Sequence, residues 1–119
     1  MALASRNLDK PDELRKFTNG EFGVVTLAGT TVGRAVFQPG WRWSNDVKPI
    51  AGTESCEAAH TGYIISGRMH VTMNDGTEGD LGPGDTFIIS PGHDAWIVGD
   101  EPCVALDWTA SEGYAKPAD

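Results

Sequence analysis

The sequence predicts an all-β fold, a sandwich or small barrel built from about eight short antiparallel strands. Glycine (15) and proline (7) are abundant for a chain of 119 residues, which favours many tight turns. Short apolar runs alternate with turn dipeptides, and no helical periodicity persists beyond about one turn. The length fits one domain whose core can form without disulfides or structural metals.

The first part of the chain is predicted to be a polar extension over residues 1–20. Asp9 resembles a helix cap, Pro11 stands where a first helical turn tolerates proline, and helix-forming residues follow. We therefore expect one or two helical turns here at most, followed by a barrel domain over residues 21–110 and a C-terminal tail over 111–119.

The barrel segment contains apolar runs bounded by glycine, proline, asparagine and aspartate, which is typical of strands joined by turns. The predicted strands are Phe22–Ala28, Val32–Gln38, Cys56–Ser66, Arg68–Asn74, Thr77–Leu81, Thr86–Ser90, Ala95–Val98 and Cys103–Thr109. The longest irregular stretch, Ser44–Ser55, is predicted to be a loop at the rim of a pocket.

The segment from residue 54 to residue 66 carries the polar groups of greatest interest. Alternation in a strand would place a carboxylate, a thiol and an imidazole on one face together with small residues, which predicts a cavity beside them. The residues of this face are Glu54, Cys56, Ala58, His60, Gly62 and Ile64. Tyr63 and Ile65 make the other face apolar, so we expect another strand layer or a second subunit to cover it, as in a homodimer.

Two glycine-bounded stretches have the spacing of known motifs. The first ends at Gly67, and the second runs from Gly84 to the Pro91-Gly92 turn. They resemble the two motifs of the cupin family, G-x5-H-x-H-x3or4-E-x6-G and G-x5-P-x-G-x2-H-x3-N. The resemblance covers residues 32–109 and implies a cupin-type jelly-roll barrel.

The resemblance also implies where a site would lie. With Gly67 as the closing glycine, His60 takes the glutamate position of the first motif, Cys56 the second histidine and Glu54 the first. In the second motif, His93 takes the histidine position if the preceding turn is two residues short, and Ala95 takes it otherwise.

We expect these residues to hold a divalent metal ion such as zinc, iron, nickel, copper or manganese. Cys56, His60 and His93 would be ligands, and Glu54 would be a fourth ligand or a hydrogen-bond partner. Two histidines with Glu54 would also supply the facial triad of non-haem iron oxygenases. Glu54 and His60 are the candidate catalytic groups. In the alternative interpretation, Cys56 fills space, His60 satisfies a buried hydrogen bond and His93 lies in a solvated turn.

Aromatic residues near the long loop are candidate ligand contacts. Trp41 and Trp43 share a side by alternation, and such rings can stack on a flat ligand. Trp43 and Phe37 are the predicted wall residues, and Arg42 could hold a substrate carboxylate at the pocket mouth. Core packing, a dimer contact or an ordinary surface charge would explain the same residues.

Composition narrows the function. The formal net charge of −8 argues against nucleic acid and anionic membrane partners. Without a visible secretion signal or apolar span, we expect a cytoplasmic protein. Its cysteines, Cys56 and Cys103, are expected to be buried free thiols.

These observations favour a small organic molecule bound inside the barrel. The leading hypothesis is a metal-dependent enzyme of the oxygenase, isomerase or lyase type. A non-catalytic binding or sensing module is one alternative, and a metal-free acid/base isomerase that uses His60 or His93 is another.

Overall fold

The computed structural model describes residues 3–110 and 114–116, and it confirms the predicted all-β jelly-roll barrel. Nine strands and two short helices are found in this part of the chain. The strands are β1 (Glu13–Phe17), β2 (Gly20–Leu27), β3 (Thr30–Phe37), β4 (His60–Ser66), β5 (Met69–Met73), β6 (Glu78–Leu81), β7 (Thr86–Ile89), β8 (His93–Ile97) and β9 (Cys103–Asp107). The helices are α1 (Trp43–Asp46) and α2 (Lys48–Ala51).

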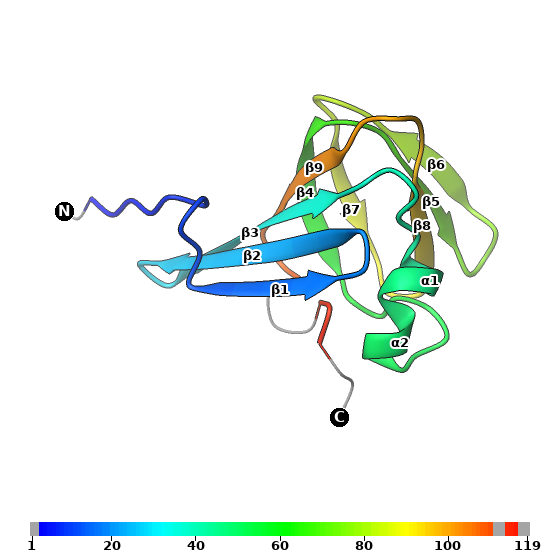
Figure 1. Ribbon diagram of the computed structural model, residues 1–119, viewed down its shortest axis with the longest axis horizontal. Helices are drawn as coiled ribbons and strands as arrows, with labels where there is room; N and C mark the ends of the chain where they lie inside the picture. The colour runs from blue at the N-terminus through cyan, green and yellow to red at the C-terminus, as the bar shows by residue number, and fades with distance from the viewer. Residues whose placement is uncertain (1–2, 111–113, 117–119) are drawn as a thin grey trace.

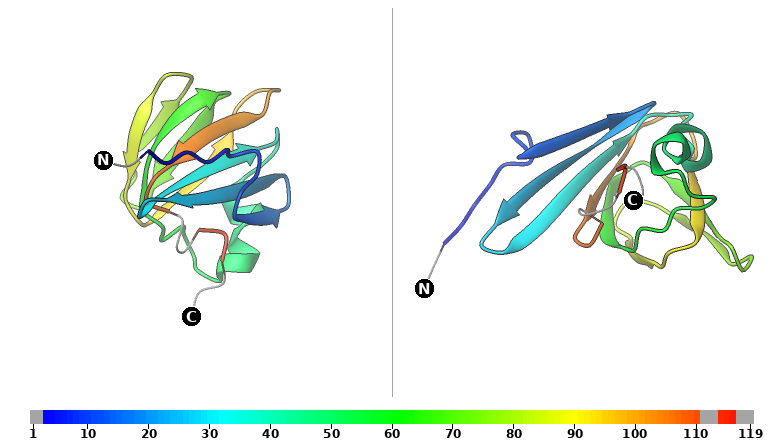
Figure 2. Two further views of the ribbon diagram at one scale, coloured as in Figure 1. Left: turned by 90° about the vertical axis from the view of Figure 1, so that its left-hand side faces the viewer. Right: turned by 90° about the horizontal axis from the view of Figure 1, so that it is seen from below.

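The strands form two antiparallel sheets. The larger sheet has the order β1-β2-β3-β9-β4-β7, and the smaller one has the order β6-β5-β8. Figure 1 shows the smaller sheet facing β9, β4 and β7, with both helices at one end of the barrel. In Figure 2 the β1-β2-β3 part of the larger sheet reaches away from the barrel body. Among the described residues, no helix is long and apolar enough to span a membrane.

The core lies between the two sheets. Trp43, Phe22 and Ile64 are its largest fully buried side chains, and they come from α1, β2 and β4. Alternation along β4 turns Gly62 and Ile64 inward, while Tyr63 and Ile65 point outward and are 36% and 46% exposed. Among the residues that the structure describes, nothing covers the outer face of β4 fully, and the homodimer through this face stays a prediction.

The N-terminal helix prediction is wrong, because the chain forms β1 there. β1 pairs with β2 through a hairpin in which Phe17 lies opposite Gly20. Asn19 takes the left-handed conformation that this tight turn requires, with a φ of 62°. Pairing with β2 therefore overrides the local helix preference of Glu13–Phe17.

The stretch predicted as an irregular loop, Ser44–Ser55, contains most of α1 and all of α2. Buried Trp43 fixes the start of α1 in the core, and Gly52 ends α2 in a left-handed conformation. β4 begins at His60 rather than at Cys56, which instead forms an isolated bridge with His93.

Turns and termini also shape the barrel. Gly92 has a φ of 94° immediately before His93, a conformation that favours glycine. Of the predicted tail over residues 111–119, the structure describes only 114–116. This piece is not a free tail, because Tyr114 belongs to the buried core.

Candidate metal centre

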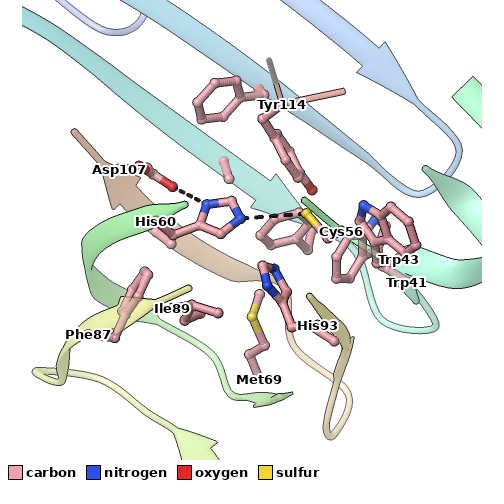
Figure 3. A pocket seen from close by; sticks show the side chains of 15 residues that line it. Trp41, Trp43, Cys56, His60, Met69, Phe87, Ile89, His93, Asp107 and Tyr114 are labelled. Carbon is pink, nitrogen blue, oxygen red and sulfur yellow. Dashed lines mark hydrogen bonds and ion pairs between the residues drawn. The ribbon is translucent and has the colours of Figure 1, made fainter. Parts of the chain in front are cut away.

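Three potential metal ligands converge inside the barrel. The ligand atoms of Cys56, His60 and His93 all lie within 4.8 Å of one another. Cys56 Sγ is 3.8 Å from His60 Nε2, and the two imidazole rings are 5.1 Å apart between centroids. Figure 3 shows the three side chains pointing toward one another. The sequence spacing predicted these residues as a set, and the fold brings them together.

Backbone pairing places two of these residues side by side. The Cys56 amide donates to the His93 carbonyl over 2.7 Å, and the Gly92 amide donates to the Cys56 carbonyl over 2.7 Å. This bridge joins the segment before β4 to the start of β8, so it links the two sheets at the site. Of the two alignments left open by the sequence, the structure therefore favours His93, although Ala95 also lines the cavity.

His60 is oriented by a buried carboxylate. Its Nδ1 lies 2.5 Å from Asp107 Oδ2 at the end of β9. Since a carboxylate only accepts hydrogen bonds, Nδ1 carries a proton, and in the neutral ring the lone pair is on Nε2, toward Cys56. Asp107 is itself held by the amides of Thr109 and Ala110, which donate to Oδ1 over 2.9 and 3.0 Å.

His93 has the same arrangement with a different partner. Its Nδ1 donates to the Ser90 carbonyl over 2.8 Å, which leaves Nε2 unprotonated. Burial lowers the pKa of His93 below its ordinary value, so the ring is neutral at pH 7. In their neutral forms both histidines offer Nε2 lone pairs, as metal-bound histidines with carboxylate or carbonyl partners do.

The thiol of Cys56 is buried. Burial raises its pKa to about 11, so the metal-free side chain is a neutral thiol at pH 7. A metal ion would bind the thiolate and displace this proton. One thiolate and two imidazoles suit zinc, copper, iron or nickel better than manganese, and three protein ligands leave a fourth position open. The donor set therefore fits a metal ion.

Glu54 does not join this group. Its side chain is 97% exposed and pairs with Lys48 Nζ over 3.1 Å. The alternation argument failed here because β4 starts at His60, and a period of two residues applies only within a strand. The facial triad of two histidines and Glu54 is therefore wrong for this structure.

A cavity of about 50 Å³ adjoins the three ligands. Trp43 and Phe37 line it together with Trp41. Arg42 is not among its lining residues, because the guanidinium lies over the Trp96 ring at 4.4 Å. The predicted role of Arg42 at the pocket mouth is therefore not supported by its position.

Two residues of the site were missed in the sequence. Asp107 follows Cys103 and Ala105 on the inward face of β9, so strand alternation could have indicated it. Tyr114 had no sequence signal, because it lies beyond the last strand. Its ring packs edge-on against His60 at 5.5 Å, and the Arg15 guanidinium donates to its carbonyl over 2.7 Å. Burial raises the pKa of Tyr114 well above its ordinary value, so the phenol is neutral.

Comparisons with known proteins agree on the fold. The family model described as a cupin domain matches residues 50–109. No curated protein matches the chain in sequence. Ninety-five chains of solved structures match it.

Three of these structures illustrate the range of proteins that share the fold. An oxalate decarboxylase from Lactobacillus farciminis, in a formate complex, is 19% identical with a TM-score of 0.60 over 86% of this chain. This chain spans only 32% of that protein. A protein of unknown function from Rhizobium leguminosarum is 17% identical, with a TM-score of 0.64 over 99% of this chain and 100% of that one. The polyketide cyclase RemF from Streptomyces resistomycificus is 13% identical, with a TM-score of 0.63 over 93% of this chain and 81% of that one.

Proposed function

The chain belongs to the cupin family, and from this premise we propose that its barrel is a metal-dependent enzyme site for a small organic molecule. Cys56, His60 and His93 would hold one divalent ion, and the substrate would occupy the adjoining cavity. The reaction is of the oxygenase, isomerase or lyase type.

One observation carries this proposal. The Nδ1 atoms of His60 and His93 are occupied by hydrogen bonds to fixed acceptors, on Asp107 and Ser90 respectively. Both Nε2 atoms are therefore available, together with Cys56 Sγ, to bind one metal ion. A histidine that only satisfies a buried hydrogen bond needs no second imidazole and no thiol beside its free nitrogen. The arrangement is typical of rings preorganised for a metal.

The residues around the ligands define what the site can do. A divalent ion bound here would polarise a substrate oxygen or lower the pKa of a water molecule. Asp107 would keep His60 in the ligand tautomer, while the rings of Phe37, Trp41 and Trp43 would exclude bulk water and contact the apolar part of the substrate. Because the Glu54 side chain lies in solvent, Glu54 would take no part in proton transfer at the site.

Elemental analysis of untagged protein purified without chelators tests the proposal. We expect nearly one zinc, iron, nickel or copper ion per chain, and loss of the ion in Cys56→Ala and His93→Ala. The chain offers matched controls, because Cys103→Ala and His70→Ala change the remaining cysteine and histidine without touching the site. A chain that takes up no metal after reconstitution with each of these ions and with manganese would contradict the proposal.

A second function is favoured by the close contact between His60 and Asp107. At 2.5 Å, the carboxylate would also stabilise a His60 imidazolium, so His60 Nε2 could act as a general base without a metal. The two functions differ in one result. Metal-free acid/base catalysis predicts activity in protein that elemental analysis shows to be free of metal, and loss of that activity in His60→Ala.

A further inference from the structure

We propose that the indole nitrogen of Trp41 and the hydroxyl of Tyr114 form a pair of hydrogen-bond donors that select a small, uncharged ligand with an acceptor oxygen. This inference names the ligand class of the cavity beside Cys56, His60 and His93, and in that sense it rests on the proposed function.

The first observation is that both donors are buried and unused. Trp41 is 2% exposed and Tyr114 is 5% exposed, and both line the cavity. Among the described residues, neither Trp41 Nε1 nor Tyr114 Oη has a hydrogen-bond partner. Buried polar atoms without partners are rare in folded proteins, and two on one cavity wall indicate that an occupant supplies the acceptor. Figure 3 shows the Tyr114 hydroxyl directed toward Cys56, next to the candidate ligands.

The second observation is that the imidazole, carboxylate and thiol groups of the cavity wall already have roles. His60 Nδ1 and Asp107 Oδ2 bond each other, and His93 Nδ1 bonds the Ser90 carbonyl. The two Nε2 atoms and the thiol form the candidate metal centre. An indole N–H can only donate, so the occupant must bring a hydrogen-bond acceptor.

Charge then limits the kind of acceptor. No lysine or arginine is among the described residues that line the cavity. A divalent ion would be neutralised by the Cys56 thiolate and the Asp107 carboxylate together, so no positive charge would remain for an anionic ligand. Since an unpaired charge is costly to bury, a carbonyl or amide oxygen suits the site better than a carboxylate or a phosphate.

The size of the cavity limits the ligand further. A buried water molecule needs about 10–15 Å³ of such space, so a cavity of about 50 Å³ holds about four non-hydrogen atoms. The rings of Phe37 and Trp41, 4.2 Å apart between centroids, would contact the apolar part of the molecule. The geometry therefore fits a short amide, ketone or aldehyde.

Acetamide and acetate are matched probes, because they have nearly the same shape and differ in charge. The chain has four tryptophans, so its ¹H–¹⁵N spectrum contains four indole cross-peaks. The Trp41 cross-peak is assigned through nuclear Overhauser contacts with the Phe37 ring. We expect acetamide to move this peak downfield and to bind at least tenfold more tightly than acetate.

Tyr114→Phe removes only the hydroxyl and keeps the ring in the core. Loss of one hydrogen bond should weaken acetamide binding about fivefold. Tyr63→Phe is the control, because Tyr63 is the remaining tyrosine and points outward, and it should bind acetamide as the wild type does.

The inference is overturned if acetamide leaves the Trp41 peak unmoved, if acetate binds as tightly, or if Tyr114→Phe binds like the wild type. Metal content is measured on the same samples. Protein that takes up no metal on reconstitution but still binds acetamide through Trp41 and Tyr114 would overturn the proposed metal site and support this inference. Metal-loaded protein that does not bind acetamide would support the proposed metal site and overturn this inference.

Discussion

Replacing Asp107 with asparagine should reverse the tautomer of His60 and weaken metal binding. Asp107 Oδ1 accepts hydrogen bonds from the amides of Thr109 and Ala110, and Oδ2 accepts one from His60 Nδ1. In Asp107→Asn, the side-chain carbonyl would stay with the two amides, and the NH₂ group would face His60. Nδ1 must then accept a hydrogen bond, so the ring proton moves to Nε2.

The loss of metal affinity in Asp107→Asn follows from the new position of the His60 ring proton. A proton on Nε2 blocks the lone pair that faces Cys56, and the ring must give up its new hydrogen bond before it can bind a metal. Changes to partners of metal-bound histidines cost about 10- to 100-fold in metal affinity. This corresponds to about 1.4–2.8 kcal/mol of binding free energy.

Competition with a chromophoric chelator measures the zinc affinity, and ¹⁵N chemical shifts of the imidazole report which nitrogen carries the proton. The control is Asp80→Asn, because Asp80 Oδ1 lies 2.7 Å from Nδ1 of His70, a similar pair away from the site. That variant should bind zinc as the wild type does. Wild-type zinc affinity in Asp107→Asn, with Nε2 still unprotonated, would refute the reasoning.

Three further predictions concern packing, reactivity and assembly. In Gly62→Ala the new methyl would collide with the backbone of β9, so urea unfolding should show that the free energy of unfolding falls by about 3 kcal/mol. In the control Gly79→Ala the methyl meets open space, and the free energy of unfolding should change by less than about 0.5 kcal/mol. Equal losses in the two variants would contradict this prediction. Burial raises the pKa of Cys56 and Cys103 to about 11, so both thiols of the native metal-free protein should react slowly with a disulfide reagent at pH 7. They should react rapidly only after the protein is unfolded. A fast reaction of the native protein would contradict the burial of these thiols. Ile88 is 81% exposed on β7, so Ile88→Glu should convert the expected dimer to a monomer in sedimentation experiments. The melting temperature of this variant should be unchanged. A monomeric wild type would show that the homodimer prediction is wrong.

Most of the barrel could be predicted from local sequence, because its turns are encoded where they occur. Gly67 and Gly92 both adopt positive φ at the predicted chain reversals. β1 could not be predicted in this way. Its residues locally favour a helix, and only pairing with β2 makes Glu13–Phe17 a strand.

The candidate site was predictable only in part, for a related reason. Motif spacing identified Cys56, His60 and His93, which lie on paired backbone segments. Glu54 was wrongly included because its position was extrapolated along a strand that had not yet begun. Asp107 and Tyr114 reach the site through long-range contacts, and these depend on the closed barrel rather than on neighbouring residues.

Anomalous diffraction from crystals of protein purified without chelators tests the metal centre most directly. The expected result is one strong peak at about 2.3 Å from Cys56 Sγ and about 2.0–2.1 Å from the Nε2 atoms of His60 and His93. A map from metal-reconstituted crystals without a peak between these three atoms, or with the metal bound elsewhere on the chain, would contradict the proposed function.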